Sequence, residues 1–295
     1  MKNEGAIMPV NIRGNSMSKE YIVLLPGGPS GDGLIYSKIF PEFKRQMEAH
    51  CKMVYYDQRG AGSSQGVYDT STLNLSQLAK DLEKIILTIK ERDRAANIFL
   101  LGYSYGGALG LSYLKGRSDL KDVEGFISIS GAFDRKHQEE NQRRLLEYLL
   151  EKWVQEGKLA NYDALKNGFS CHDAVDIEGC RQDSIKTVKL VNAEISDLEK
   201  YGRFRLKGST ILGLLGYMFF SPGNPIQSGI AEGQNGQYFQ KEFDGLDLRE
   251  DISGIKTPIL LVNGRFDTNV PFFEAQEIFD KIGTPVHQKK ILILE

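Results

Sequence analysis

The feature that most constrains this chain is a short apolar strand that runs directly into a serine flanked by glycines. Residues 98–101 are all apolar, as a strand buried on both faces requires. Residues 102–106 read Gly-Tyr-Ser-Tyr-Gly, and residues 107–114 are predicted to form a helix. In so tight a turn, side chains larger than the two glycines would clash with the strand or the helix. The pattern therefore predicts a strand, a sharp turn with Ser104 at its apex, and a helix.

This turn also suggests a chemical role for Ser104. A strained turn holds the serine hydroxyl out of the sheet, and amide N–H groups at the start of a helix face it, ready to stabilise an anion. The alternative is an ordinary glycine-rich turn between strand and helix. The apolar run before Ser104 and the helix after it favour a nucleophile.

Composition and charge narrow the class of protein. Hydrophobic residues make up 41% and charged residues 26% of the 295 residues, which is ordinary for a globular protein. The net charge of −2 provides no basic surface, so nucleic acid is not an expected partner. No apolar run reaches the length of a membrane span, and no signal-peptide core follows the first residues. We therefore expect a cytoplasmic protein with no membrane partner.

The three cysteines predict no disulfide framework. Cys51 opens an apolar strand and is expected to be a small buried hydrophobic residue. Cys171 and Cys180 are expected to be free thiols, as in most cytoplasmic proteins. The stretch Cys171-His-Asp173 has no second ligand pair at a recognised metal spacing, so we expect neither a metal nor a cofactor.

Strands and helices alternate along much of the chain. An amphipathic helix is predicted at 75–89, because its apolar residues fall at helical spacing. The alternation resumes with a strand in the stretch Pro258–Asp267, followed by a helix at 272–282 and a last strand at 290–294. The other predicted strands are 7–13, 21–25, 52–57, 98–101 and 125–131. This order predicts the α/β class, with a mostly parallel sheet flanked by helices on both faces.

The character of the chain changes at about Asp134. Residues 138–156 are charged and predicted to be helical, and no strand–helix alternation follows until about Asp251. We interpret this stretch as a helical cap inserted into the core. The expected division is a first part of the core at 1–133, the cap at 134–250, and a second part of the core at 251–295.

The loop at residues 26–33 is rich in glycine, which lets backbone N–H groups approach a ligand closely. It lacks the Lys-Ser/Thr ending of a phosphate loop, so nucleotide binding is excluded.

Four signals follow one another along the chain. They are Gly-Gly-Pro at 27–29, Asp-Gln-Arg-Gly-Ala-Gly-Ser at 57–63, the turn at Ser104, and Gly-Arg-Phe-Asp at 264–267. Together they resemble the α/β-hydrolase fold and, within it, the proline iminopeptidase-like serine hydrolases. The resemblance covers residues 20–133 and 255–295 and is more specific for the superfamily than for the aminopeptidase activity. Pro26 stands where the family pattern usually begins with His.

The resemblance implies a role for each matching residue. Ser104 would be the nucleophile, and the backbone N–H groups of Gly28 and Tyr105 would form the oxyanion hole. Gly27 is the less favoured second donor. Asp267, at the carboxyl end of its strand, would orient the catalytic histidine and stabilise its charged form.

Three other charged residues have weaker claims. Asp134, after the preceding strand, is the alternative acid. Asp57 and Arg59 are expected to hold their loop by an ion pair rather than to take part in the chemistry.

The resemblance also implies a catalytic histidine shortly after the last strand, where this sequence ends at Glu295. His50 and His287 precede their strands, which places His287 roughly 20 Å from the catalytic edge of the sheet. His172 has no anchoring motif, and His137 follows a strand on the correct side without a turn that aims it. We therefore expect the histidine beyond Glu295, in a chain truncated before it. The chain as written should be nearly inactive, since losing one triad member costs on the order of 10⁴–10⁶ in rate.

The implied reaction is hydrolysis of a small amide or ester through an acyl-enzyme, without metal or cofactor. The favoured substrate is a short peptide with an N-terminal proline, whose free amine would need carboxylates of the cap. Candidates for that role are Glu194, Glu199 and Glu232. Two alternatives stay open: a carboxylester or lactone hydrolase with the same machinery, and a non-catalytic binding protein on this fold.

Overall fold

The structure, a computed structural model, describes residues 1–29, 31–39, 41–115, 117, 122–155, 225–250 and 252–294. Several residues predicted from the sequence lie outside this part of the chain: Cys171, His172, Cys180, Glu194 and Glu199. The backbone of Glu232 is described, but its side chain is not.

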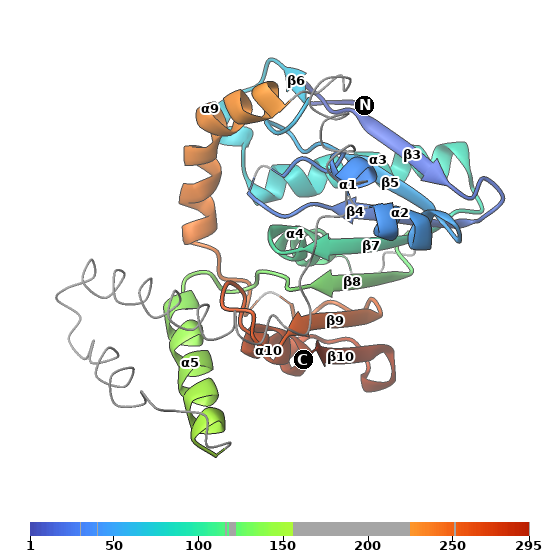
Figure 1. The fold of residues 1–295 in the computed structure, drawn as a ribbon. Helices are drawn as coiled ribbons and strands as arrows, with labels where there is room; N and C mark the ends of the chain where they lie inside the picture. The colour runs from blue at the N-terminus through green and yellow to red at the C-terminus, as the bar shows by residue number, and fades with distance from the viewer. Residues whose placement is uncertain are drawn as a thin grey trace. The chain divides into compact units, whose positions relative to one another are not determined.

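A seven-stranded sheet forms the centre of the fold, in the order β10-β9-β8-β7-β4-β5-β3 (Figure 1). The strands are β3 Val10–Gly14, β4 Glu20–Leu25, β5 Lys52–Tyr56, β7 Asn97–Tyr103, β8 Gly125–Ile129, β9 Ile259–Gly264 and β10 Lys289–Leu294. Every neighbouring pair is parallel except β3 with β5, which is antiparallel. The predicted mostly parallel sheet is therefore confirmed, with β3 as its antiparallel edge strand.

A second, three-stranded sheet was not predicted. It joins β1 Lys2–Asn3, β2 Ala6–Ile7 and β6 Gln65–Gly66 by antiparallel pairing. Strands of two residues are too short to show any periodicity in the sequence.

Helices cover the large sheet on both faces. In the described residues of the unit that contains this sheet, the helices are α1 Tyr36–Ile39, α2 Pro41–Glu48, α3 Leu75–Arg92, α4 Tyr105–Leu114, α9 Pro225–Asp244 and α10 Phe272–Lys281, with 3₁₀ turns η1 Thr70–Thr72 and η3 Val286–Gln288. Apolar residues of α3, α4 and α10 join one buried cluster with the sheet, and Met47 of α2 packs against a second cluster, on the other face. Helix α2 begins at Pro41, and proline favours the first position of a helix.

Helix α3 shows how local sequence sets these elements. The side chain of its N-cap, Asn74, accepts the backbone N–H of Gln77 at 2.8 Å, which satisfies one of the free amides of the first turn. Its apolar residues lie on one buried face. The predicted amphipathic helix is thus confirmed, and it extends to Arg92.

The central strands are buried on both faces, as the apolar run at 98–101 predicts. Alternate residues of β7 enter the two clusters: Leu100 joins the cluster of α3 and α4, and Leu101 joins the other. Cys51 is buried in the second cluster and is a free thiol, as predicted, and burial raises the pKa of that thiol.

The chain divides into two compact units, residues 1–136 with 206–295, and residues 137–205. Helix α5, Gln138–Gln155, lies in the second unit, whereas α9 lies in the first. The expected insertion at 134–250 differs from these limits at both ends. The physical reason on the C-terminal side is that α9 packs on the core, with the ring of Phe239 completely buried. A helical cap over the strand ends stays a prediction.

No helix in the described ranges is both long enough and apolar enough to cross a membrane.

Candidate active site

Ser104 occupies a strained turn between β7 and α4. Its backbone has φ 53° and ψ −119°, in a region that residues other than glycine rarely adopt. The surrounding backbone holds it there: the N–H groups of Gly107 and Ala132 donate to its carbonyl at 2.8 and 2.9 Å, and its own N–H donates to the carbonyl of Ile129 at 3.1 Å. The predicted strand, sharp turn and helix are confirmed, and strain of this kind is typical of functional sites.

The two glycines of the turn are required by close backbone approaches. A Cβ on Gly102 would lie 2.4 Å from the carbonyl oxygen of Gly106. A Cβ on Gly106 would lie 2.0 Å from the carbonyl oxygen of Leu25, at the end of β4. Both distances are too short for any side chain, which confirms the steric argument from the sequence.

The glycine-rich loop after β4 reaches the serine. A Cβ on Gly27 would lie 3.3 Å from Cβ of Ser104 and 3.0 Å from the ring of Tyr103. The Gly27 backbone hydrogen-bonds to the Tyr36 oxygen, while burial raises the pKa of Tyr36 to about 12. Gly28 is exposed and has φ 139°, a conformation that favours glycine. Gly28 stays the predicted second oxyanion donor, with Gly27 as the less favoured alternative.

Asp57 organises the loops beside this site. It is completely buried, and its two carboxyl oxygens accept the backbone N–H groups of Leu34 at 3.0 Å and Ser63 at 2.8 Å. Burial, together with a hydrogen bond to Asp32, raises the pKa of Asp57 to about 8. The two acids thus join the loop after β4 to the loop after β5.

The predicted ion pair between Asp57 and Arg59 is wrong. Arg59 is completely buried and instead binds Asp81 of α3, with its Nε and Nη2 atoms each 2.8 Å from a carboxylate oxygen. Its guanidinium also donates to the carbonyl oxygens of Asn3 and Glu4, both at 3.0 Å. Arg59 therefore fixes the N-terminal segment to α3.

Asp267 lies in the loop that follows β9. Its Oδ1 accepts the backbone N–H groups of Asn269 and Val270, both at 3.0 Å, and its side chain is half-buried. Strands β7 and β9 are parallel and separated only by β8, so their carboxyl ends lie about 10 Å apart at one edge. The topology thus brings Ser104 and Asp267 to the same edge of the sheet, as a nucleophile and its acid require.

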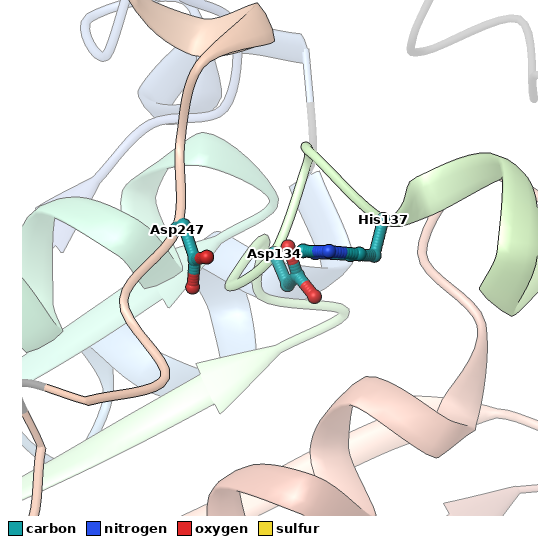
Figure 2. A group of neighbouring side chains, drawn as sticks. All are labelled: Asp134, His137 and Asp247. Carbon is teal, nitrogen blue, oxygen red and sulfur yellow. The ribbon is translucent and has the colours of Figure 1, made fainter.

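Asp134, the alternative acid, already has a cationic partner. Its carboxylate lies 3.4 Å from Nε of Arg249, and the same guanidinium lies 2.7 Å from Asp247. Carboxylate oxygens of the two acids lie within 4.8 Å of one another (Figure 2). The same view draws His137, the first residue of the second compact unit. The guanidinium makes Asp134 a less suitable partner for a catalytic histidine than Asp267.

The structure adds a buried acid that sequence reasoning missed. Glu274, in the first turn of α10, accepts the backbone N–H groups of Phe133 at 3.1 Å and Asp134 at 3.3 Å. Burial raises the pKa of Glu274 to about 8. A single acidic residue at the start of a helix is common, so the sequence contains no signal for this role.

Two of the four histidines lie in the described part of the first unit. His287 is exposed in η3, just before β10, and His50 is exposed just before β5. Both therefore precede their strands, as the sequence indicates, and lie at the edge of the sheet opposite Ser104.

The sheet and the serine turn are those of an α/β-hydrolase, and comparisons with known proteins agree. A solved α/β-hydrolase from a deep-sea metagenome, MGS-M2, matches 97% of this chain and 85% of its own, with a TM-score of 0.55 and 14% identity. The family of serine aminopeptidases S33 matches residues 20–196, well over half of the sequence. The chain belongs to this family and is a hydrolase.

Two curated relatives are aminopeptidases by name. A proline iminopeptidase of Saccharolobus solfataricus is 32% identical over 137 residues, which are 46% of this chain and 41% of the relative. A probable aminopeptidase of Bacillus subtilis, YbaC, is 20% identical over 280 residues, 93% of this chain and 82% of the relative. The chain thus resembles proline iminopeptidases, although the match with the first relative spans about two fifths of that protein's length.

Proposed function

We propose that this protein hydrolyses a small amide or ester through an acyl-enzyme on Ser104. The observation that carries the proposal is the strained backbone of Ser104 between β7 and α4, with φ 53°. In the proposed mechanism the Ser104 hydroxyl attacks the substrate carbonyl, and the backbone N–H groups of Gly28 and Tyr105 stabilise the resulting oxyanion. Asp267 orients the histidine that takes the serine proton and passes it to the departing amine or alcohol as the C–N or C–O bond breaks. Water then attacks the acyl-enzyme, which releases the acid and restores the serine hydroxyl.

The proposed histidine lies outside the described residues. His50 and His287 are exposed at the opposite edge of the sheet, so neither reaches the Ser104 hydroxyl. If no residue of this chain supplies that base, Ser104 is expected to react slowly. Free imidazole is then expected to replace the missing base, because it has the same acid–base chemistry.

The proposed substrate is a short peptide with an N-terminal proline. The support is the family and the proline iminopeptidase among the relatives. The cap carboxylates at Glu194, Glu199 and Glu232 remain predictions for binding the free amine. A cytoplasmic location is also part of the proposal and would be checked by cell fractionation.

The test measures covalent labelling of Ser104 by a fluorophosphonate, with and without imidazole. Wild-type protein should be labelled faster in imidazole, and Ser104→Ala should not be labelled under either condition. Labelling that survives Ser104→Ala would mean that another residue is the nucleophile. Absence of labelling in wild-type protein at high imidazole would favour a non-catalytic binding protein.

Substrate class is decided separately. Turnover of proline-β-naphthylamide in imidazole would support the aminopeptidase. Turnover of p-nitrophenyl esters alone would support the carboxylester or lactone hydrolase instead.

A further inference from the structure

The side chain of Tyr105 is held by a contact that reaches from the serine turn to a distant helix. Tyr105 is the first residue of α4 and directly follows Ser104. Its ring is almost completely buried, and its hydroxyl donates to Oε2 of Glu242 in α9 at 3.4 Å. The neighbouring ring of Phe243 meets the Tyr105 ring edge-on, with centroids 5.5 Å apart.

Glu242 is itself fixed at the N-terminus of α3. Its Oε1 and Oε2 lie 2.6 and 2.8 Å from the backbone nitrogen of Leu75, which donates to the carboxylate. The first amides of a helix have no partner within the helix, and the helix dipole favours a negative charge there. Burial raises the pKa of Glu242, whereas the hydrogen bonds from Leu75 and Tyr105 lower it. One half-buried carboxylate thus joins three helices: α3, α4 and α9.

Helix α9 is held in place by other contacts as well. The amide of Asn235 donates to the carbonyl oxygen of Gly60 at 3.0 Å, and the ring of Phe239 is completely buried. Removing the Glu242 carboxylate therefore leaves α9 with its other anchors. The loss would act mainly on Tyr105 and on the start of α3.

We propose that Glu242 is a positioning residue. By accepting the hydrogen bond of the Tyr105 hydroxyl, it holds Tyr105 so that the backbone N–H of this residue points toward the oxyanion. The inference rests on the proposed function, because it needs Ser104 as the nucleophile. The physical reason is that Ser104 has a strained backbone that its neighbours must hold, and Tyr105 is the adjacent residue. An oxyanion donor acts well only when its position is set before the reaction.

The test uses phenylboronic acid, whose boron forms a bond to the serine Oγ while the hydroxyl proton passes to the buffer. The resulting tetrahedral, negatively charged adduct imitates the reaction intermediate, so its affinity reports the oxyanion donors. Calorimetric titration gives the dissociation constant for each variant. Thermal melting of the same samples separates lost positioning from lost folding.

Glu242→Ala and Tyr105→Phe are each expected to weaken boronate binding about fivefold to tenfold, the value of one hydrogen bond. The double variant should bind no more weakly than either single variant, because both remove one interaction. Glu242→Gln retains an acceptor oxygen and should restore most of the affinity. Gln240→Ala, on the same helix in an exposed pair with Asp244, is the matched control and should leave binding unchanged.

Two outcomes would overturn the inference. One is that Glu242→Ala binds the boronate as wild type does. The other is that the losses of Glu242→Ala and Tyr105→Phe multiply in the double variant, which would mean that the residues act independently. If Glu242→Ala does not fold, Glu242→Gln and Tyr105→Phe decide: a Tyr105→Phe variant that binds normally refutes the role.

The proposed function fails in a different way. If Ser104→Ala binds the boronate as tightly as wild type, or wild type does not bind it even at high imidazole, then Ser104 is not the nucleophile and both proposals fall. Binding that depends on Ser104 but not on Glu242 or Tyr105 removes only the present inference.

Discussion

Replacing Arg59 by methionine tests the buried ion pair that ties the N-terminal segment to α3. In the native protein the guanidinium is completely buried and makes two hydrogen bonds of 2.8 Å with Asp81. It makes two more, of 3.0 Å, with the carbonyl oxygens of Asn3 and Glu4. Methionine has a similar volume but provides none of these donors.

The expected cost follows from what remains after the substitution. The Asp81 carboxylate is 1% exposed and would keep its hydrogen bond from the amide of Asn3, at 2.7 Å. Removing one member of a buried ion pair costs about 3–5 kcal/mol, because the remaining charge is buried without compensation. Against a net stability of roughly 5–15 kcal/mol for a domain, Arg59→Met should remove a large part of the margin.

Urea unfolding followed by circular dichroism gives the free energy of unfolding for each variant. The double variant Arg59→Met/Asp81→Leu should be more stable than the single variant Arg59→Met, since the double variant leaves no unpaired buried charge. Lys281→Ala, which breaks a partly exposed pair with Glu277, is the matched control and should cost less than about 1 kcal/mol. The reasoning is refuted if Arg59→Met costs no more than this control, or if the double variant is less stable than Arg59→Met.

Three further predictions concern backbone space, pH and the edge strand. Gly106→Ala should abolish labelling of Ser104 and lower the melting temperature, since its Cβ would lie 2.0 Å from a backbone oxygen of β4. The control Gly233→Ala, in open space on α9, should raise the free energy of unfolding by about 0.5–1 kcal/mol. Equal melting points of the two variants would contradict this prediction. The pKa of Asp57 is raised to about 8, so the folded state binds this proton more tightly than the unfolded state does. The free energy of unfolding should therefore fall as pH rises from about 4 to about 8. Asp57→Asn should make that fall shallower in urea titrations at several pH values, and an unchanged slope would exclude Asp57 as its source. Leu292 and Leu294 on β10 are 38% and 55% exposed. Replacing both by lysine should reduce light scattering on heating, because it removes an apolar strand edge, with little change in melting temperature. Undiminished scattering would show that aggregation starts elsewhere.

The serine turn and the parallel sheet could be predicted because their causes are local. A short apolar run such as 98–101, ended by glycine, favours a strand with two buried faces, and the close approach of backbone at Gly102 and Gly106 admits only glycine. In each case the signal and the structure lie within a few residues of one another.

The polar contacts of the site could not be predicted, because they depend on residues far apart in the chain. Arg59 and Asp57 are two residues apart, so an ion pair between them was the simplest expectation. The folded chain instead brings Asp81 to Arg59, 22 positions away, and Glu242 to Leu75, 167 positions away. Pairing of this kind depends on tertiary packing that no single stretch of sequence encodes.

The order of the strands has a consequence for how the protein is made. Strand β9 pairs with β8, but β8 ends at Ile129 and β9 begins at Ile259 (Figure 1). Roughly 130 residues leave the ribosome between the two, which takes about 6–26 s at ~5–20 residues per second. Throughout that interval the finished strands β3 to β8 present an unpaired edge of apolar residues to the solvent. Nascent chains stalled in this interval should therefore be the form that chaperones bind and that aggregates first.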